Sequence, residues 1–181
     1  MKIRVIASSV RYRSGRGKKT QSNFSFMTVE NISIIITNPD EKVAAIIEEL
    51  SANLYLRFGS DGKNSFTDWQ ANNLKYVFVI AEIENEIVGC GAIRPISETV
   101  GEVKRMYSKY PRKQIGKTIL SFLEDIALKR GYQELILETR VKNTEATQFY
   151  RKQGYKVIPN YGKYTDRPEA ICFGKSLKLN S

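Results

Sequence analysis

The spacing of apolar residues from Ile32 onward predicts strands first. A β-branched run fills residues 32–38, and two further apolar runs, at 76–83 and 87–95, are separated by the polar turn "ENE". Runs of this length and composition are typical of strands, and the short turn between the last two predicts a hairpin. Ahead of the hairpin, apolar residues at helical spacing predict a helix with Asp40 as its N-cap, namely Val43, Ile46, Ile47 and Leu50.

The second half of the chain alternates strands with two amphipathic helices. A stripe of apolar residues follows the basic stretch at 109–114 and stops at Gly131, and another helix is expected from Asn143 to Gly154. Because helices interleave with strands in only part of the chain, the order predicts an α/β (α+β) domain with a mixed sheet and helices on both faces. The apolar runs that predict strands here lie at 101–108, 134–139, 156–160 and 170–177.

Two segments fall outside this pattern. Residues 58–69, "FGSDGKNSFTDW", are rich in turn residues and predict a mobile loop near a short helix. Residues 1–30 hold seven Lys and Arg against one acid, a net +6 of the chain's +10, and show no sustained periodicity. We expect this basic extension to lie outside the domain core, which then spans residues 31–181. Three interpretations of it stay open: a leader produced by translation upstream of Met27, an arm that contacts nucleic acid, and a transit peptide.

Composition narrows the available chemistry. The chain has 181 residues, 41% of them hydrophobic, which suits one soluble domain with a substantial core. No apolar run approaches the ~20 residues of a membrane-spanning helix, and we expect a cytoplasmic protein with no membrane partner. Histidine is absent and Cys90 and Cys172 are the only cysteines, so a disulfide framework, a zinc site and a histidine triad are unsupported. We expect no metal, and chemistry based on carboxylates, tyrosine, lysine, hydroxyls or backbone amides.

The basic loop before Gly116 predicts a phosphate site. Unpaired N–H groups and the positive end of the helix dipole meet at such a helix start. The stretch "GKT" at 116–118 resembles the end of a Walker A loop, but Pro111 stands where that pattern needs its first glycine. The next strand also ends in Glu138-Thr139, not in the aspartate that organises magnesium, so a nucleotide-phosphate enzyme is disfavoured. The residues that add charge or allow close approach of the backbone are Arg112, Lys113, Gly116 and Lys117.

Several motifs in a fixed order carry a resemblance to a known family. They are "EVKRMY" at 102–107, the helix end "GY" at 131–132, "LILET" at 135–139 and an "N-x-x-A-x-x-F-Y-x-x-x-G-Y" helix from Asn143. From about Ile32 to Leu177 the chain resembles the GNAT superfamily of acyl-CoA-dependent N-acetyltransferases. The resemblance implies the GNAT fold, with a mostly antiparallel sheet of six to seven strands. It also implies acetyl-CoA as co-substrate and a small-molecule or protein amine as acceptor.

The family's chemistry is attack of an amine on the acetyl thioester through an oxyanion. By resemblance, Tyr150 is the acid that protonates the departing thiolate, whereas the residue taken without the resemblance favours a core position. Glu102 and Glu138 are the candidate bases, and water is the alternative. Asn143 either contacts the pantetheine arm or only caps its helix. The CoA site implied by the resemblance comprises backbone N–H groups of Met106, Tyr107 and Ser108, then Arg112, Lys113, Gln114, Ile115, Gly116, Lys117 and Thr118, and Asn143.

The phosphate loop departs from the family pattern. Pro111 replaces a Gln or Arg, and Gln114 replaces the loop's first glycine, which would allow a closer approach of the backbone. A degenerate member that binds acyl-CoA without turnover is therefore a second hypothesis. A third is a nucleic-acid or ribosome-associated protein that acts through the basic arm, since we do not expect the domain itself to bind nucleic acid.

Residues for the acceptor are expected on one strand and in a late loop. Lys104 and Arg105 are neighbours on a strand and should face opposite ways. By resemblance, Arg105 faces the acceptor, and together with Arg57 it suggests a carboxylate or phosphate near the acceptor amine. The late segment "PNYGKYTDRPEAICF" resembles a loop that closes over the acceptor through Tyr161 and Tyr164, or it is a hydrophobic turn. A homodimer stays open.

Overall fold

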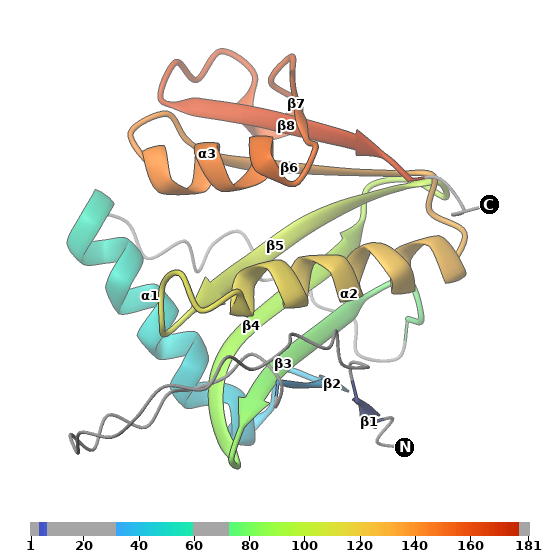
Figure 1. Cartoon of the computed structure of the whole chain (residues 1–181). Helices are drawn as coiled ribbons and strands as arrows, with labels where there is room; N and C mark the ends of the chain where they lie inside the picture. The colour runs from blue at the N-terminus through green and yellow to red at the C-terminus, as the bar shows by residue number, and fades with distance from the viewer. Residues whose placement is uncertain (1–3, 7–31, 60–72, 178–181) are drawn as a thin grey trace, which may run out of the picture.

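A single twisted sheet organises the molecule (Figure 1). The structure is a computed structural model that describes residues 4–6, 32–59 and 73–177. Within these residues, eight strands lie in the order β1-β2-β3-β4-β5-β6-β8-β7, and only β5 and β6 pair in parallel. This confirms the mixed, mostly antiparallel sheet. The strands are β1 (Arg4–Ile6), β2 (Ser33–Thr37), β3 (Val77–Ile83), β4 (Glu86–Pro95), β5 (Val100–Ser108), β6 (Glu134–Arg140), β7 (Lys156–Ile158) and β8 (Ala170–Ser176).

Helices cover both faces of the sheet, as predicted. Alternate residues of β3 point to opposite sides: Val77 and Val79 pack in one core with α2, whereas Phe78 and Ile80 pack in another with α1. A strand buried on both faces reads as a continuous apolar run, which is what this stretch of sequence shows. The helical elements in the described residues are η2 (Glu41–Val43), α1 (Ala44–Phe58), α2 (Ile115–Lys129), α3 (Thr144–Lys152) and η4 (Gly162–Tyr164).

The first helix begins later than the predicted cap. Residues 41–43 form the short 3-10 helix η2, and Asp40 accepts a hydrogen bond from Val43 N through its main-chain oxygen, at 3.1 Å. Helix α1 then starts with Val43 as N-cap and no side-chain cap bond. The helix ends at Gly59, whose φ of 70° is the left-handed conformation that glycine adopts without strain. Most of the predicted mobile loop at 58–69 lies outside the described residues.

The sheet opens between β5 and β6. Their parallel pairing runs only from Val100↔Glu134 to Glu102↔Ile136, yet β5 continues to Ser108 and β6 to Arg140. An irregularity in the β4–β5 pairing falls where Arg105 has a φ of 54°, and a bulge of this kind bends a strand. Beyond residue 102, β5 therefore has no partner on its β6 side among the described residues, and the two strands diverge (Figure 1).

Helix α2 lies close against the sheet because β4 carries glycine beneath it. A Cβ atom on Gly91 would lie 2.7 Å from Cγ2 of Ile119, a distance that real Cβ atoms essentially never show. Ile119 and Leu123 are fully buried at this contact. The close packing holds α2 directly against β4.

Strand β1 pairs antiparallel with β2, while the rest of residues 1–30 lies outside the described residues, so the domain boundary and the three interpretations of the arm stay predictions. Among the residues that the structure describes, none of the helices has the length and apolar character needed to span a membrane.

Candidate functional site

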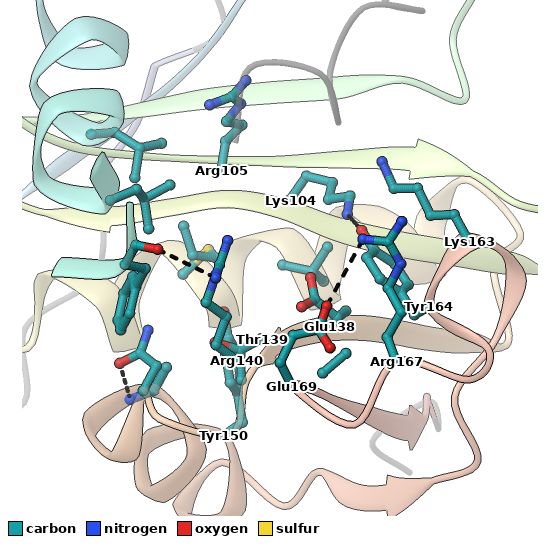
Figure 2. Close-up of a pocket in the computed structure, with 18 residues that line it drawn as sticks. Lys104, Arg105, Glu138, Thr139, Arg140, Tyr150, Lys163, Tyr164, Arg167 and Glu169 are labelled. Atoms are coloured by element: carbon teal, nitrogen blue, oxygen red, sulfur yellow. Dashed lines mark hydrogen bonds and ion pairs between the residues drawn. The ribbon is translucent and has the colours of Figure 1, made fainter. Parts of the chain in front are cut away.

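The opening between β5 and β6 leads into a cleft of about 600 Å³ (Figure 2). Helix α1 contributes apolar Leu50, Leu54 and Phe58, whereas β5, β6, α3 and residues 163–170 contribute mostly polar or charged side chains. A concave site of this size, with an apolar side and convergent polar groups, suits a small molecule.

Tyr150 lines this cleft from helix α3. Its ring packs edge-on against Phe149 and Tyr155, with centroids 5.2 and 5.8 Å away, which fixes the side chain. Burial, with a smaller contribution from the charge of Glu138, raises the pKa of the Tyr150 hydroxyl. The hydroxyl makes no hydrogen bond within the described residues, so it is a protonated group that can donate to a molecule in the cleft.

Glu138 lines the same cleft from β6. Burial raises the pKa of its carboxyl above the usual value, and the nearby positive charge of Lys104 offsets only part of this effect. No hydrogen bond or ion pair to this carboxylate occurs within the part of the chain that the structure describes. Glu138 is therefore a carboxylate with raised proton affinity that faces the cleft without a partner from those residues.

Glu102, the other candidate base, lies beneath the cleft and does not line it. Its side chain is fully buried, with Nε of Arg94 at 2.5 Å, Nζ of Lys104 at 2.9 Å and the Tyr161 hydroxyl at 2.7 Å. Burial alone would raise the pKa of Glu102, but Lys104, Tyr161 and Arg94 together hold it below its usual value. The carboxylate thus has a high cost of protonation, and its oxygens are already used by the protein.

The two basic residues of β5 lie at its bulge, where Arg105 has a φ of 54°. Both contribute to the lining of the cleft, and Figure 2 shows their side chains pointing apart as expected, with Lys104 directed toward Tyr164 and Arg105 directed away from it. Lys104 also donates to the Tyr164 hydroxyl at 2.6 Å, and burial lowers the pKa of this lysine. No residue type in the sequence marks the bulge.

The two tyrosines of the late loop have different surroundings. Tyr164 lines the cleft, whereas Tyr161 lies behind it with its hydroxyl on Glu102. The two rings meet edge-on at 5.6 Å. Tyr161 bonds to Glu102 and Tyr164 bonds to Lys104, so the segment from residue 159 to residue 169 is held against buried charged residues of β5.

The predicted phosphate loop joins β5 to α2. Gln114 is the N-cap of α2 and has a φ of 59°, a conformation that glycine adopts more easily. Its side chain makes no cap bond, so the first N–H groups of the helix are not capped by it. A Cβ atom on Gly116 would have Phe149 as its nearest neighbour at 3.7 Å, which shows that the start of the helix is uncrowded. Arg112, Lys113 and Lys117 are exposed around it, Thr118 bonds through Oγ1 to the Gln114 oxygen at 3.1 Å, and Ile115 is buried in the core.

The end of β5 offers its backbone to the opening. The Tyr107 hydroxyl donates to Glu49 at 2.9 Å, and Ser108 Oγ donates to the Tyr110 oxygen at 3.1 Å, so both side chains are engaged within the protein. Met106 packs partly buried against the main core and also lines the cleft. Only the backbone of this stretch is left on the edge that faces β6.

Asn143 and Arg57 hold the rim of the cleft. Asn143 caps α3, with Oδ1 accepting from Ala146 N at 3.3 Å, and its side chain lines the cleft. Arg57, at the end of α1, is 2.9 Å from Glu145 and 3.4 Å from Asn143 Oδ1, and it does not line the cleft. Arg57 therefore joins α1 to α3 across the rim.

Three basic residues of the cleft were missed by sequence reasoning. Arg140 donates to the Phe58 oxygen at 3.4 Å, and Arg167 lies 4.0 Å from Glu169. Lys163 precedes Tyr164 in η4. The only signal available was the presence of basic residues among the aromatics of the late segment, which does not reveal that β6 lies opposite them.

Comparison with known proteins identifies the fold and the family. The model of the Acetyltransferase (GNAT) family matches residues 43–155, which is more than half of the chain. The chain belongs to the GNAT acetyltransferase family. It is an N-acetyltransferase, and its sheet is the GNAT sheet with β5 and β6 as the diverging pair.

Relatives match along most of the domain. An IAA acetyltransferase of Azospirillum brasilense is 33% identical over 152 residues, covering 81% of this chain and 99% of the relative. A crystal structure from Klebsiella pneumoniae, assigned to the acyl-CoA N-acyltransferases, has a TM-score of 0.69 at 27% identity and covers 81% of this chain and 98% of its own. The PaiA N-acetyltransferase of Thermoplasma acidophilum in complex with coenzyme A has a TM-score of 0.62 at 24% identity, with 80% and 99% covered.

Proposed function

We propose that this acetyltransferase moves an acetyl group from acetyl-CoA to a primary amine by direct attack of the amine on the thioester. The observation that carries the proposal is the end of β5–β6 pairing at Glu102↔Ile136, which opens the sheet onto a cleft lined by Tyr150 and Glu138. The T. acidophilum neighbour, which has this fold, was crystallised with coenzyme A.

The residues present fit a CoA-type molecule. The free edge of β5 at 103–108 offers backbone groups for the pantetheine amides, as an added strand would use them. The uncapped start of α2 and the exposed charges of Arg112, Lys113 and Lys117 suit the phosphates. When bound, acetyl-CoA supplies an activated thioester.

The chain's own groups then have distinct tasks. We assign Glu138 to accept the proton of the attacking amine, because its raised pKa makes it a better base than an ordinary glutamate. Tyr150 donates its proton to the departing sulfur. N–H groups of the backbone at 106–108 stabilise the charge that develops on the carbonyl oxygen. After the products leave, Glu138 releases its proton to solvent and Tyr150 takes one up from solvent, so the full cycle neither gains nor loses a proton.

Glu102 has a different role in this scheme. Its buried oxygens face Arg94, Lys104 and Tyr161, and its lowered pKa makes it a weak base. We therefore assign it to positioning the late loop, and not to proton transfer.

An amine panel with acetyl-CoA tests the proposal, with release of free CoA thiol as the readout and mass spectrometry of the acetylated product as confirmation. Tyr150→Phe should lose turnover and keep acetyl-CoA binding. Tyr155→Phe is the matched control, since that ring packs against Tyr150 but does not line the cleft. Tight acetyl-CoA binding without transfer to any amine would favour the degenerate acyl-CoA-binding hypothesis instead.

A further inference from the structure

The charged residues of the cleft are unevenly divided. Five basic residues line it, against two acidic ones, Glu138 and Glu169, and among the five only Arg105 directs its side chain away from Glu138 in Figure 2. The basic residues are Lys104, Arg105, Arg140, Lys163 and Arg167. A partly enclosed site with an excess of one charge raises the local concentration of ligands of the opposite charge.

Part of this positive charge is not neutralised by the protein. Lys104 forms an ion pair with Glu102 at 2.9 Å, so the protein already neutralises its charge. Within the described residues, Arg140 and Lys163 have no carboxylate partner within 4.0 Å. Arg167 is 4.0 Å from Glu169, and both side chains are more than half exposed, at 58% and 55%, which is a weak pair.

These cations surround the candidate base. Figure 2 shows Glu138 between Arg140 on one side and Arg167 with Lys163 on the other. An amine that approaches Glu138 therefore presents the rest of its body to a positive surface. A second positive charge on the acceptor would be repelled there, whereas an anionic group would be attracted.

We infer that the acceptor is a small primary amine that also carries a carboxylate, and that Lys163 and Arg167 bind this carboxylate while the amine faces Glu138. The inference rests on the proposed function and names its substrate class. The planar guanidinium of Arg167 matches a carboxylate with two parallel hydrogen bonds, and Lys163 adds a point charge. The cleft of about 600 Å³ accommodates a molecule of amino-acid size.

Acetyl transfer to amines of similar chain length that carry different end groups tests this inference. Acetyl transfer is measured to β-alanine, to uncharged-tailed propylamine, to 1,3-diaminopropane and to 2-aminoethylphosphonate, and then to longer members of each series. The inference expects kcat/KM at least about tenfold higher for the amino carboxylates than for the amines without an anionic group. Equal or better transfer to propylamine or the diamine overturns it, and a clear preference for the phosphonate overturns the carboxylate assignment.

Variants that each remove one positive charge test whether Lys163 and Arg167 bind the carboxylate of the acceptor. Lys163→Gln and Arg167→Gln should each raise KM for the amino carboxylate by about five- to tenfold, with kcat and the KM for acetyl-CoA nearly unchanged. Lys163→Arg should restore the KM. Lys152→Gln, on the exposed side of α3, is the control with the same loss of charge outside the cleft.

These experiments distinguish failure of the proposed function from failure of the inference about the acceptor. Failure of acetyl-CoA to bind, or transfer to none of the amines, contradicts the proposed function and the inference together. Transfer that ignores the carboxylate, or variants whose KM stays at the wild-type value, contradicts the inference alone.

Discussion

Replacing Glu102 by glutamine removes one negative charge from a buried cluster without changing its volume. The carboxylate is fully buried, and Lys104, which lies 2.9 Å away, is only 8% exposed. Arg94 is less affected by the loss of this carboxylate, because its side chain is 23% exposed and water can solvate its charge. The substitution therefore leaves the ammonium of Lys104 as the main uncompensated charge.

Breaking a buried ion pair by removing one partner costs about 3 to 5 kcal/mol. Loss of the proton from Lys104 limits this cost, because burial already lowers the pKa of that lysine. For a domain of this size, each kcal/mol lowers Tm by about 2 to 4 °C, so we expect a decrease of about 6 to 20 °C. The double variant E102Q/K104M should recover part of this loss, since it removes both charges.

Thermal and urea unfolding at neutral pH measure the effect. Glu138→Gln is the matched control: burial raises the pKa of Glu138, so its charged form is unfavourable in the folded protein and its removal should be neutral or stabilising. The account of the cluster is refuted if Glu102→Gln and Glu138→Gln change stability equally.

The pH dependence of unfolding gives an independent check on Glu102. Its pKa is lower in the folded state than in the unfolded chain, so its contribution is present above the unfolded value of about 4.3 and is lost as pH falls through the lower folded value. Wild-type protein should therefore lose stability more steeply on the acid side than Glu102→Gln does. Parallel curves would contradict this assignment.

Three further predictions concern catalysis and the phosphate loop. Tyr150→Phe should lower kcat about 100-fold or more while acetyl-CoA binding by calorimetry changes little, and unchanged turnover would make Tyr150 a core residue. Glu138→Gln should lower kcat and abolish the acidic limb of the pH–rate profile, which lies above the usual glutamate range because burial raises this pKa; persistence of that limb would assign it to another group. Gln114→Gly should stabilise the fold by up to about 1 kcal/mol and tighten CoA binding or leave it unaffected, because it relieves a left-handed backbone at φ 59°. Clear weakening of binding would show that the Gln114 side chain is itself a ligand.

The elements of the fold were readable because each has its own apolar spacing. The β3 run is apolar throughout because helices cover both of its faces, and the α2 stripe stops at the glycine that follows the helix. The start of α1 was misplaced because Asp40 has the composition of a cap while the chain continues through a 3-10 turn.

The site was less readable because it depends on contacts between distant segments. Arg94 and Glu102 lie opposite each other in the β4–β5 register, and Tyr161 reaches the same carboxylate from 59 residues along the chain. Sequence alone names both Glu102 and Glu138 as candidate bases and does not reveal that the oxygens of Glu102 are bound by Arg94, Lys104 and Tyr161. The bulge at Arg105, which bends β5 where it borders the cleft, has no signature in residue type.

Calorimetric titration of the purified protein with acetyl-CoA, with ATP as the competing phosphate ligand, tests whether the opening between β5 and β6 binds CoA. We expect one acetyl-CoA to bind per chain with micromolar affinity and ATP to bind much more weakly, because the free edge of β5 recognises the pantetheine arm and not only the phosphates. Absence of acetyl-CoA binding, or equal binding of ATP, would contradict the claim that the β5–β6 opening is a CoA site.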